Sequence, residues 1–204
     1  MSLEPYGLEG RVQISDDLYA VYDGKGGVID YEPADGITYE RAMTALAILQ
    51  DTRRATANYA LFKSGKLAVT PEQITRLTCF AWQFSVTPLA HLSKNQWLDM
   101  FRYGGFVSTE PGVATPPESI TLYRGGHPRE TESGFGMSWT SDRETAEFFA
   151  NDYHSNRGGC IFTAEVKAPA ILAHINTLGK NEYVIDPDDA ESFTLLGSEL
   201  AAAP

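Results

Sequence analysis

Cysteine is scarce in this 204-residue chain, which has only Cys79 and Cys160. Two cysteines so far apart exclude a disulfide framework and the paired spacing of a zinc site. We expect both to be buried thiols, which fits a reducing, cytoplasmic setting in the producing or host cell. The histidines lack ligand spacing as well, so no metal site is predicted; they are His91, His127, His154 and His174.

Long hydrophobic runs are also missing. No apolar segment approaches the roughly 20 residues that a membrane-spanning helix requires, so no membrane association is expected. The first residues, Met1–Pro5, have neither the basic nor the apolar region of a signal peptide, and we expect no secretion. With 43% hydrophobic and 21% charged residues, the composition is that of a globular protein that buries a sizeable core.

Basic residues are few: 16 Lys and Arg stand against 27 Asp and Glu, which gives a formal net charge of −11. Residues 1–110 carry 10 basic and 13 acidic side chains, whereas residues 111–204 carry 6 and 14. A surface that binds nucleic-acid backbone needs clustered Lys and Arg, so broad DNA or RNA binding is not expected. A protein partner with a basic face stays compatible with so acidic a second half.

The first third of the chain changes from a strand-like to a helical pattern. Val12–Tyr31 alternates apolar and polar residues around the glycine-rich Asp23–Gly27, which predicts a β-hairpin. From Thr38 onwards, apolar residues recur at helical spacing. We expect this helical stretch to be broken near Arg53 and to end at Gly65.

Two later segments carry strong helix-start signals. Thr70-Pro71-Glu72-Gln73 combines a cap residue, a proline at the first helical position and a glutamine three residues after the cap. Ser93-Lys94-Asn95-Gln96 repeats this capping box. We therefore predict a helical lobe over residues 38–103. Its aromatic side chains are expected to form its core; they are Phe80, Trp82, Phe84, Trp97 and Phe101.

The pattern changes again after the proline-rich segment 107–118, which is typical of a loop. Short β-branched and aromatic runs follow, with one helix expected at about 142–153. The predicted strands are Ser119–Tyr123, Cys160–Val166, Ile171–Ile175, Glu182–Ile185 and Ser192–Leu196. We predict an α+β protein of one domain with a mostly antiparallel β core. Its parts are a hairpin region at 1–36, a helical lobe at 37–110 and the β core at 117–198.

Three polar side chains stand at the edges of predicted strands. Arg124 offers a rigid guanidinium fork for phosphate oxygens, and Gly125 and Gly126 after it let the backbone approach a ligand. Ser138 lies in an extended segment, where its hydroxyl can orient a carboxylate or a ribose. Glu182 opens a strand, where a carboxylate needs a partner. Each also has a structural alternative: an ion-paired arginine, a plain strand-edge hydroxyl and a solvated acid.

Two neighbours of Ser138 have simpler interpretations. Ser141, with Glu144 three residues later, matches a capping box and is assigned to the start of the predicted helix. Trp139 is expected to face away from Ser138, because side chains alternate along an extended segment, and to pack in the core.

In this order, the three motifs resemble the ADP-ribosyltransferase superfamily in its Arg-Ser-Glu class. The resembling residues are Tyr123-Arg124-Gly125, Ser138-Trp139-Thr140-Ser141 with Ala146, Phe149 and Ala150 behind it, and Glu182-Tyr183-Val184-Ile185. The motifs cover about residues 119–196, and the preceding helices resemble the helical part of bacterial toxin members. The resemblance implies a split β core that binds NAD, within one domain over 1–204.

The resemblance also implies a role for each residue. Arg124 would hold the NAD phosphates and brace the site, and Gly125 would offer backbone hydrogen bonds to the nicotinamide amide. Ser138 would orient Glu182, whose carboxylate would bind the 2′-hydroxyl of the nicotinamide ribose. Thr140 would support the motif from behind.

The implied activity is that of an NAD-dependent mono-ADP-ribosyltransferase with a macromolecular acceptor, expected to be a protein, as in bacterial or phage effectors. Either Phe148 or Phe149 is the candidate to stack on nicotinamide; the alternative for both, which stand at helical spacing, is a place in the core. Arginine-modifying members carry Glu two positions before the catalytic Glu, and another branch carries Gln, whereas this chain has Lys180. Two alternatives therefore stay open: an NAD glycohydrolase on the same site, and a catalytically silent relative whose acidic surface binds a basic partner.

Overall fold

The computed structural model describes residues 10–22, 27–153, 159–177, 179–190 and 192–196. The chain divides into two units, residues 1–105 and 106–204. Separate hydrophobic clusters lie in the two units. The boundary precedes the predicted end of the helical lobe at residue 110. In the described part of the chain, no helix has the length and apolar character needed to cross a membrane.

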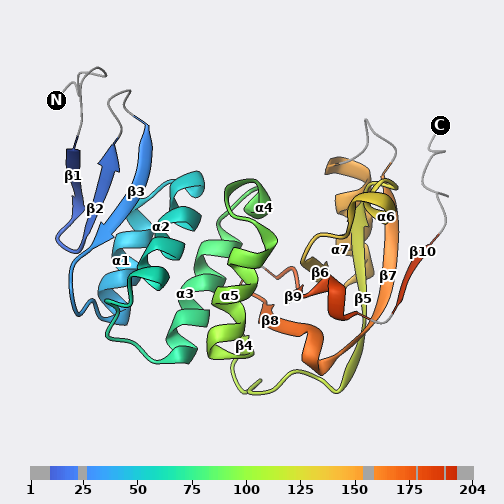
Figure 1. Ribbon diagram of the computed structural model, residues 1–204. Helices are drawn as coiled ribbons and strands as arrows, with labels where there is room; N and C mark the ends of the chain where they lie inside the picture. Colours follow the sequence, from blue (N-terminus) through green and yellow to red (C-terminus); the bar gives the residue numbers. More distant parts are fainter. Residues whose placement is uncertain (1–9, 23–26, 154–158, 178, 191, 197–204) are drawn as a thin grey trace. The chain divides into compact units, whose positions relative to one another are not determined.

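The first unit begins with an antiparallel sheet in the order β1-β2-β3 (Figure 1). Its strands are Gly10–Ser15, Leu18–Tyr22 and Val28–Pro33. The predicted hairpin corresponds to β2 and β3, and residues 23–26 of its expected turn lie outside the described residues. The predicted extent was wrong, because the stretch before the turn is divided into β1 and β2, which pair with each other. Their connection at Asp16 and Asp17 has no glycine or proline to mark it.

Helices follow the sheet in the first unit. They are α1 (Tyr39–Ile48), α2 (Asp51–Ser64), α3 (Pro71–Gln83), α4 (Pro88–His91) and α5 (Lys94–Gly104). The break between α1 and α2 lies at Leu49 and Gln50, so its predicted place near Arg53 was wrong. The cause is buried Arg54, whose guanidinium donates to the carbonyls of Leu46 (3.0 Å) and Leu49 (2.7 Å). These bonds satisfy carbonyls at the end of α1.

Both predicted capping boxes are confirmed, at Thr70 for α3 and at Ser93 for α5. The two helices pack through Trp82, Trp97 and Phe101, with the two indole rings edge to face at 5.0 Å. Large aromatic side chains packed in this way dominate the energetics of a core. Phe84 does not share this role, because 41% of its surface is exposed.

The second unit is built on a sheet in the order β10-β7-β5-β6-β9-β8-β4. Its strands are β4 (Val107–Ser108), β5 (Ser119–Gly126), β6 (Ser138–Thr140), β7 (Cys160–Lys167), β8 (Ile171–Ile175), β9 (Glu182–Ile185) and β10 (Ser192–Leu196). All its strand pairs are antiparallel apart from β4 with β8. The prediction of an α+β protein with a mostly antiparallel core is therefore confirmed. β4 lies within the segment predicted as loop, where two residues are too few for a sequence signal.

The sheet of the second unit has a weak seam. β5 and β6 are joined by a single residue pair, Tyr123 with Thr140, whereas β5 pairs with β7 along its full length. The seam separates the group β10-β7-β5 from the group β6-β9-β8-β4. Arg124 was predicted to follow a strand that ends at Tyr123. This was wrong, because β5 continues to Gly126 and Arg124 lies within it.

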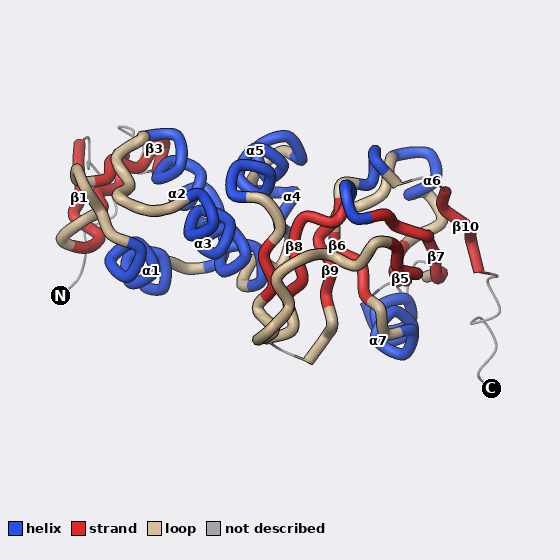
Figure 2. Tube along the Cα trace, turned by 90° about the horizontal axis from the view of Figure 1, so that it is seen from below, coloured by secondary structure: helices blue, strands red, loops and turns tan. Residues whose placement is uncertain are grey.

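Helical segments lie on both sides of β5 (Figure 2). They are α6 (Glu130–Ser133) on one side and α7 (Arg143–Phe148) on the other, and α7 continues into a π-helical turn, Phe149–Tyr153. The helix predicted at 142–153 is thus confirmed in extent. Two short 3₁₀ turns, Ala168–Ala170 and Pro187–Asp189, flank β8 and β9.

Side chains alternate between the two faces of this sheet. On the α7 face, Tyr123 packs against a cluster of Ala146, Ala150 and Ile161. On the other face, Trp139 lies in the cluster that contains Leu122, Phe162 and Ile185. Trp139 is 2% exposed, which confirms that it faces away from Ser138 and packs in the core.

Candidate functional site

Ser138 and Glu182 meet on the α7 face of the sheet. They are the first residues of β6 and β9, and the strands pair Ser138 with Val184 and Thr140 with Glu182. This register places the two side chains on one face as diagonal neighbours. The Ser138 hydroxyl donates to Oε1 of Glu182 at 2.6 Å, a length typical of a hydrogen bond to a carboxylate. The predicted orientation of Glu182 by Ser138 is thus present in the structure.

Arg124 reaches β6 from β5, and because side chains alternate along a strand it leaves the face opposite to that of Tyr123. Its Nη1 donates to the Ser138 carbonyl at 2.8 Å, and its Nε donates to Oε2 of Glu130 on α6 at 2.7 Å. The Arg124 and Glu130 side chains are only 20% and 15% exposed. Because a partly buried charge needs a partner, Glu130 holds the guanidinium against β6 across the seam. The predicted bracing role is visible, and the contact with NAD phosphates stays a prediction.

Sequence reasoning missed Glu130. Its carboxylate accepts the Arg124 bond and also the backbone N–H of His127 at 3.2 Å. Arg124 lies on β5 and Glu130 on α6, so the pair forms only because the chain folds back between them, and no periodicity within one element predicts it. The signal that existed was weaker: an arginine within a strand of an acidic half of the chain needs an acid from somewhere.

Gly125 lies under α7. A Cβ at this position would come within 2.2 Å of the Ala146 carbonyl oxygen and 2.5 Å of the Ala150 nitrogen. Any other residue would therefore collide with helix backbone, and the glycine is required for the close approach of α7 to β5. This packing role was not predicted, and a backbone contact of Gly125 with nicotinamide stays a prediction.

Thr140 ties the site to the segment before β9. Its hydroxyl donates to the Lys180 carbonyl at 2.8 Å and accepts the backbone N–H of Asp142 at 3.0 Å. Thr140 is buried and lies opposite Glu182 in the sheet. The predicted supporting role of Thr140 thus has a definite form, because one hydroxyl holds the approaches to both Glu182 and α7.

The helix start predicted at Ser141 was wrong, because Asp142 caps α7. Its carboxylate accepts the backbone N–H of Glu144 at 3.0 Å and the Thr145 hydroxyl at 2.8 Å. The Thr145 bond and the backbone bonds hold the pKa of Asp142 below its ordinary value. A carboxylate is favoured at this position by the helix dipole as well.

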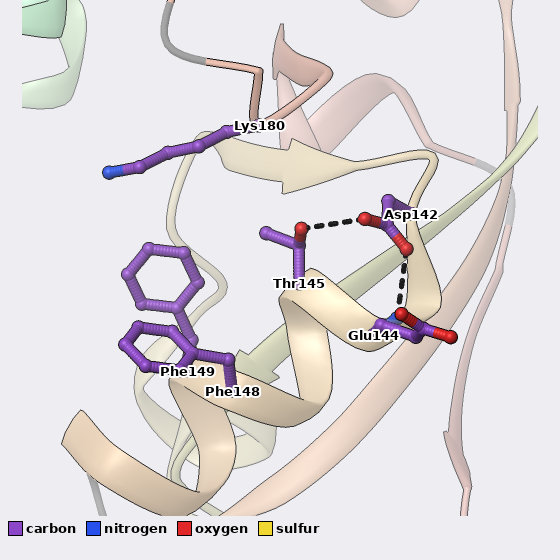
Figure 3. A pocket seen from close by; sticks show the side chains of 6 residues that line it. All are labelled: Asp142, Glu144, Thr145, Phe148, Phe149 and Lys180. Atoms are coloured by element: carbon purple, nitrogen blue, oxygen red, sulfur yellow. Dashed lines mark hydrogen bonds between the residues drawn. The ribbon is translucent and has the colours of Figure 1, made fainter.

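A pocket of about 300 Å³ lies between α7, with its π-helical turn, and Lys180 (Figure 3). It is lined by Asp142, Glu144, Thr145, Phe148, Phe149 and Lys180. The Lys180 ammonium lies 5.4 Å from the centre of the Phe149 ring, and Phe148 is 55% exposed. Both rings named as candidates to stack on nicotinamide are therefore at an accessible surface, although stacking itself stays a prediction.

The Cys160 thiol of this unit is buried. Burial raises the pKa of the Cys160 thiol to about 11, with a smaller contribution from Glu130, so the nucleophilic thiolate is disfavoured. Among the described residues, no group of three His, Cys, Asp or Glu side chains is placed to hold a metal ion. His154 lies outside the described residues.

Comparison of this chain with models of protein families, with curated proteins and with solved structures finds no match.

Proposed function

We propose that the second unit binds NAD, cleaves its nicotinamide–ribose bond and transfers ADP-ribose to a macromolecular acceptor. The observation that carries the proposal is the 2.6 Å hydrogen bond from the Ser138 hydroxyl to the Glu182 carboxylate. It lies next to the seam between β5 and β6, which Arg124 bridges through its bond to the Ser138 carbonyl. These are the three residues that resemble the Arg-Ser-Glu class of ADP-ribosyltransferases. The division of the sheet at Tyr123 and Thr140 also suits the split β core of that superfamily.

The chemistry asked of Glu182 agrees with its surroundings. Nicotinamide in NAD is a cationic leaving group, so it departs as a neutral molecule and needs no general acid. Positive charge instead develops on the ribose, as in glycoside hydrolysis, and a fixed carboxylate stabilises it. The Ser138 hydroxyl donates to Oε1 of Glu182, so the carboxylate is held in one position on the α7 face of the sheet.

A second candidate function is NAD glycohydrolysis on the same residues. Lys180 stands two residues before Glu182, where arginine-modifying members of the resembling family carry an acid. An ammonium cannot take a proton from an attacking arginine. Water would then be the acceptor, and the product would be free ADP-ribose.

Release of nicotinamide from labelled NAD tests the proposal. Wild type and Glu182→Gln are compared, with and without a cell lysate. We expect the variant to stay folded and to lose at least about 100-fold in rate, because the charge that stabilises the ribose cation is gone. Release together with labelled macromolecule, both lost in the variant, supports the transferase.

The other results each decide against a part of the proposal. Release that leaves no macromolecule labelled favours the glycohydrolase. No release in any condition rejects the enzyme and favours a silent relative that binds a basic partner through the acidic second half of the chain.

A further inference from the structure

The pocket beside Lys180 shares a face of the sheet with the carboxylate of Glu182. Tyr123, Thr140 and Glu182 stand opposite one another on neighbouring strands, so their side chains project to one side. Tyr123 packs against Ala146 of α7, which identifies this side as the α7 face. Since α7 and its π-helical turn supply Thr145, Phe148 and Phe149 to the pocket lining, the pocket opens on the same face.

The backbone of Lys180 is held next to the proposed reaction centre. Its carbonyl accepts the Thr140 hydroxyl at 2.8 Å, and Thr140 pairs directly with Glu182. In Figure 3 the Lys180 side chain extends over the pocket, with its ammonium on the side of the Phe148 and Phe149 rings. The pocket therefore combines the Phe148 and Phe149 rings with the positive charge of Lys180, which stands two residues before Glu182 in the sequence.

The pocket lining has two carboxylates, those of Asp142 and Glu144. The Asp142 carboxylate is committed to capping α7, where it accepts from Glu144 and Thr145. An ammonium has three donors and no acceptor, so Lys180 cannot remove a proton. An arginine or a hydroxyl must lose a proton on attack, whereas a carboxylate, with an ordinary pKa of about 4, is already ionised.

We infer that the acceptor is a carboxylate side chain of a protein, bound through its charge by Lys180. This inference rests on the proposed function and names its substrate class. An oxygen of the acceptor carboxylate bonds to C1′ of the ribose. The bond from C1′ to the nicotinamide nitrogen breaks, and its electron pair neutralises the ring. The products are a glycosyl ester and nicotinamide, and no proton is released.

A protein carboxylate fits better than a phosphate of nucleic acid. Phosphate backbones are bound by clusters of Lys and Arg, yet residues 111–204 carry 6 basic and 14 acidic side chains. In the pocket itself, Lys180 stands with the acidic Asp142 and Glu144. One ammonium beside two phenyl rings offers a single counter-charge, which suits one small anion and not a run of phosphates.

The linkage formed by the wild-type protein tests the inference. Labelled NAD and a cell lysate are incubated with the protein, and the product is treated with neutral hydroxylamine. Hydroxylamine attacks the acyl carbon of a glycosyl ester and leaves a hydroxamic acid on the modified Asp or Glu, which mass spectrometry locates. We expect most of the protein label to be released with hydroxamates at those residues.

Variants assign this selectivity to Lys180. In Lys180→Gln the share of released nicotinamide that ends as protein label should fall at least about tenfold, because the acceptor loses its counter-charge. Lys180→Arg keeps the charge and should retain most of that share. Lys167→Gln, a change at an exposed lysine on β7, should match the wild type.

Several results would overturn the inference. Label on arginine, on a hydroxyl or on nucleic acid would do so, as would transfer that is lost in Glu144→Gln, because a base in the pocket would then be at work. Nicotinamide release without any label would also reject it and leave NAD cleavage in place. The absence of nicotinamide release, in contrast, rejects NAD cleavage itself, on which the proposed function depends.

Discussion

At the scale of single residues, the Ser138 hydroxyl fixes one oxygen of the Glu182 carboxylate at 2.6 Å. Hydrogen bonds to charged groups are worth about 1.5–3 kcal/mol, so Ser138→Ala should lower nicotinamide release by about 10- to 100-fold. Ser141→Ala makes the same change three residues away and should leave the rate within about twofold. Equal losses in the two variants would show that Ser138 has no particular part in orienting Glu182.

Asn181 carries backbone strain next to the site. It has a φ of 43° and is the described non-glycine residue with positive φ. An L-residue in this region costs about 1–2 kcal/mol, which asparagine tolerates better than most residues. We expect Asn181→Ala to lower the free energy of unfolding by about 1 kcal/mol, and Asn181→Gly to leave it nearly unchanged. Urea unfolding of both variants checks this, and an alanine variant as stable as the glycine variant would contradict it.

At the scale of elements, the contact of α7 with β5 depends on Gly125. A Cβ there would meet helix backbone at 2.2 Å, whereas at Gly126 it would meet the end of the Glu130 side chain at 2.4 Å. Backbone cannot yield as a side chain can, so Gly125→Ala should cost about 2–3 kcal/mol, towards the upper part of the overpacking range. Gly126→Ala should cost less. Thermal unfolding of the pair measures the difference, and the reverse order would contradict this packing.

The cap of α7 gives the second unit a pH dependence at low pH. Hydrogen bonds from Thr145 and the backbone lower the pKa of Asp142 in the folded state. Because its pKa is lower in the folded state, the ionised carboxylate stabilises the fold at pH values above its unfolded pKa of about 3.9. This contribution is lost as the pH falls through the folded pKa. Asp142→Asn keeps a capping oxygen but does not titrate. The stability difference between the two proteins should therefore be constant above about pH 5 and shrink below about pH 4. A difference that is independent of pH would contradict it.

Which elements could be predicted depended on whether their cause is local. The capping boxes at Thr70 and Ser93 and the strand at Glu182 were found because each is determined by a few adjacent residues. The break between α1 and α2 was misplaced because Arg54 stabilises it through side-chain bonds to the preceding helix. The start of α7 was misplaced because Ser141 and Asp142 are both good caps, and it is the Asp142 carboxylate that accepts the backbone N–H of Glu144.

The candidate site shows the same division. Ser138 and Glu182 were predicted together, and they do meet, because strand alternation and pairing determine which side chains share a face. Glu130 could not be predicted, since its contact with Arg124 depends on how α6 folds back over β5. The pocket was not predicted either, because it needs Lys180 and Phe149, which are distant in the sequence, to come together.

At the scale of the whole molecule, each unit holds one thiol in its interior. Cys79 lies on α3 in the first unit at 2% exposure, and Cys160 lies on β7 in the second at 0%. Burial excludes reagents from both, and a pKa of about 11 further disfavours the Cys160 thiolate. We expect neither thiol to react with a maleimide at about pH 8 in the native protein, and both to react in denaturant.

The same thiols report on the folding of each variant. If Glu182→Gln and Ser138→Ala lose activity while both thiols stay protected, the loss belongs to the site and not to unfolding. Variants that retain only Cys79 or only Cys160 assign any labelling to one unit. Rapid labelling of Cys160 in the wild type would contradict the buried position of β7, and with it the scaffold that holds β5 and Arg124 in place.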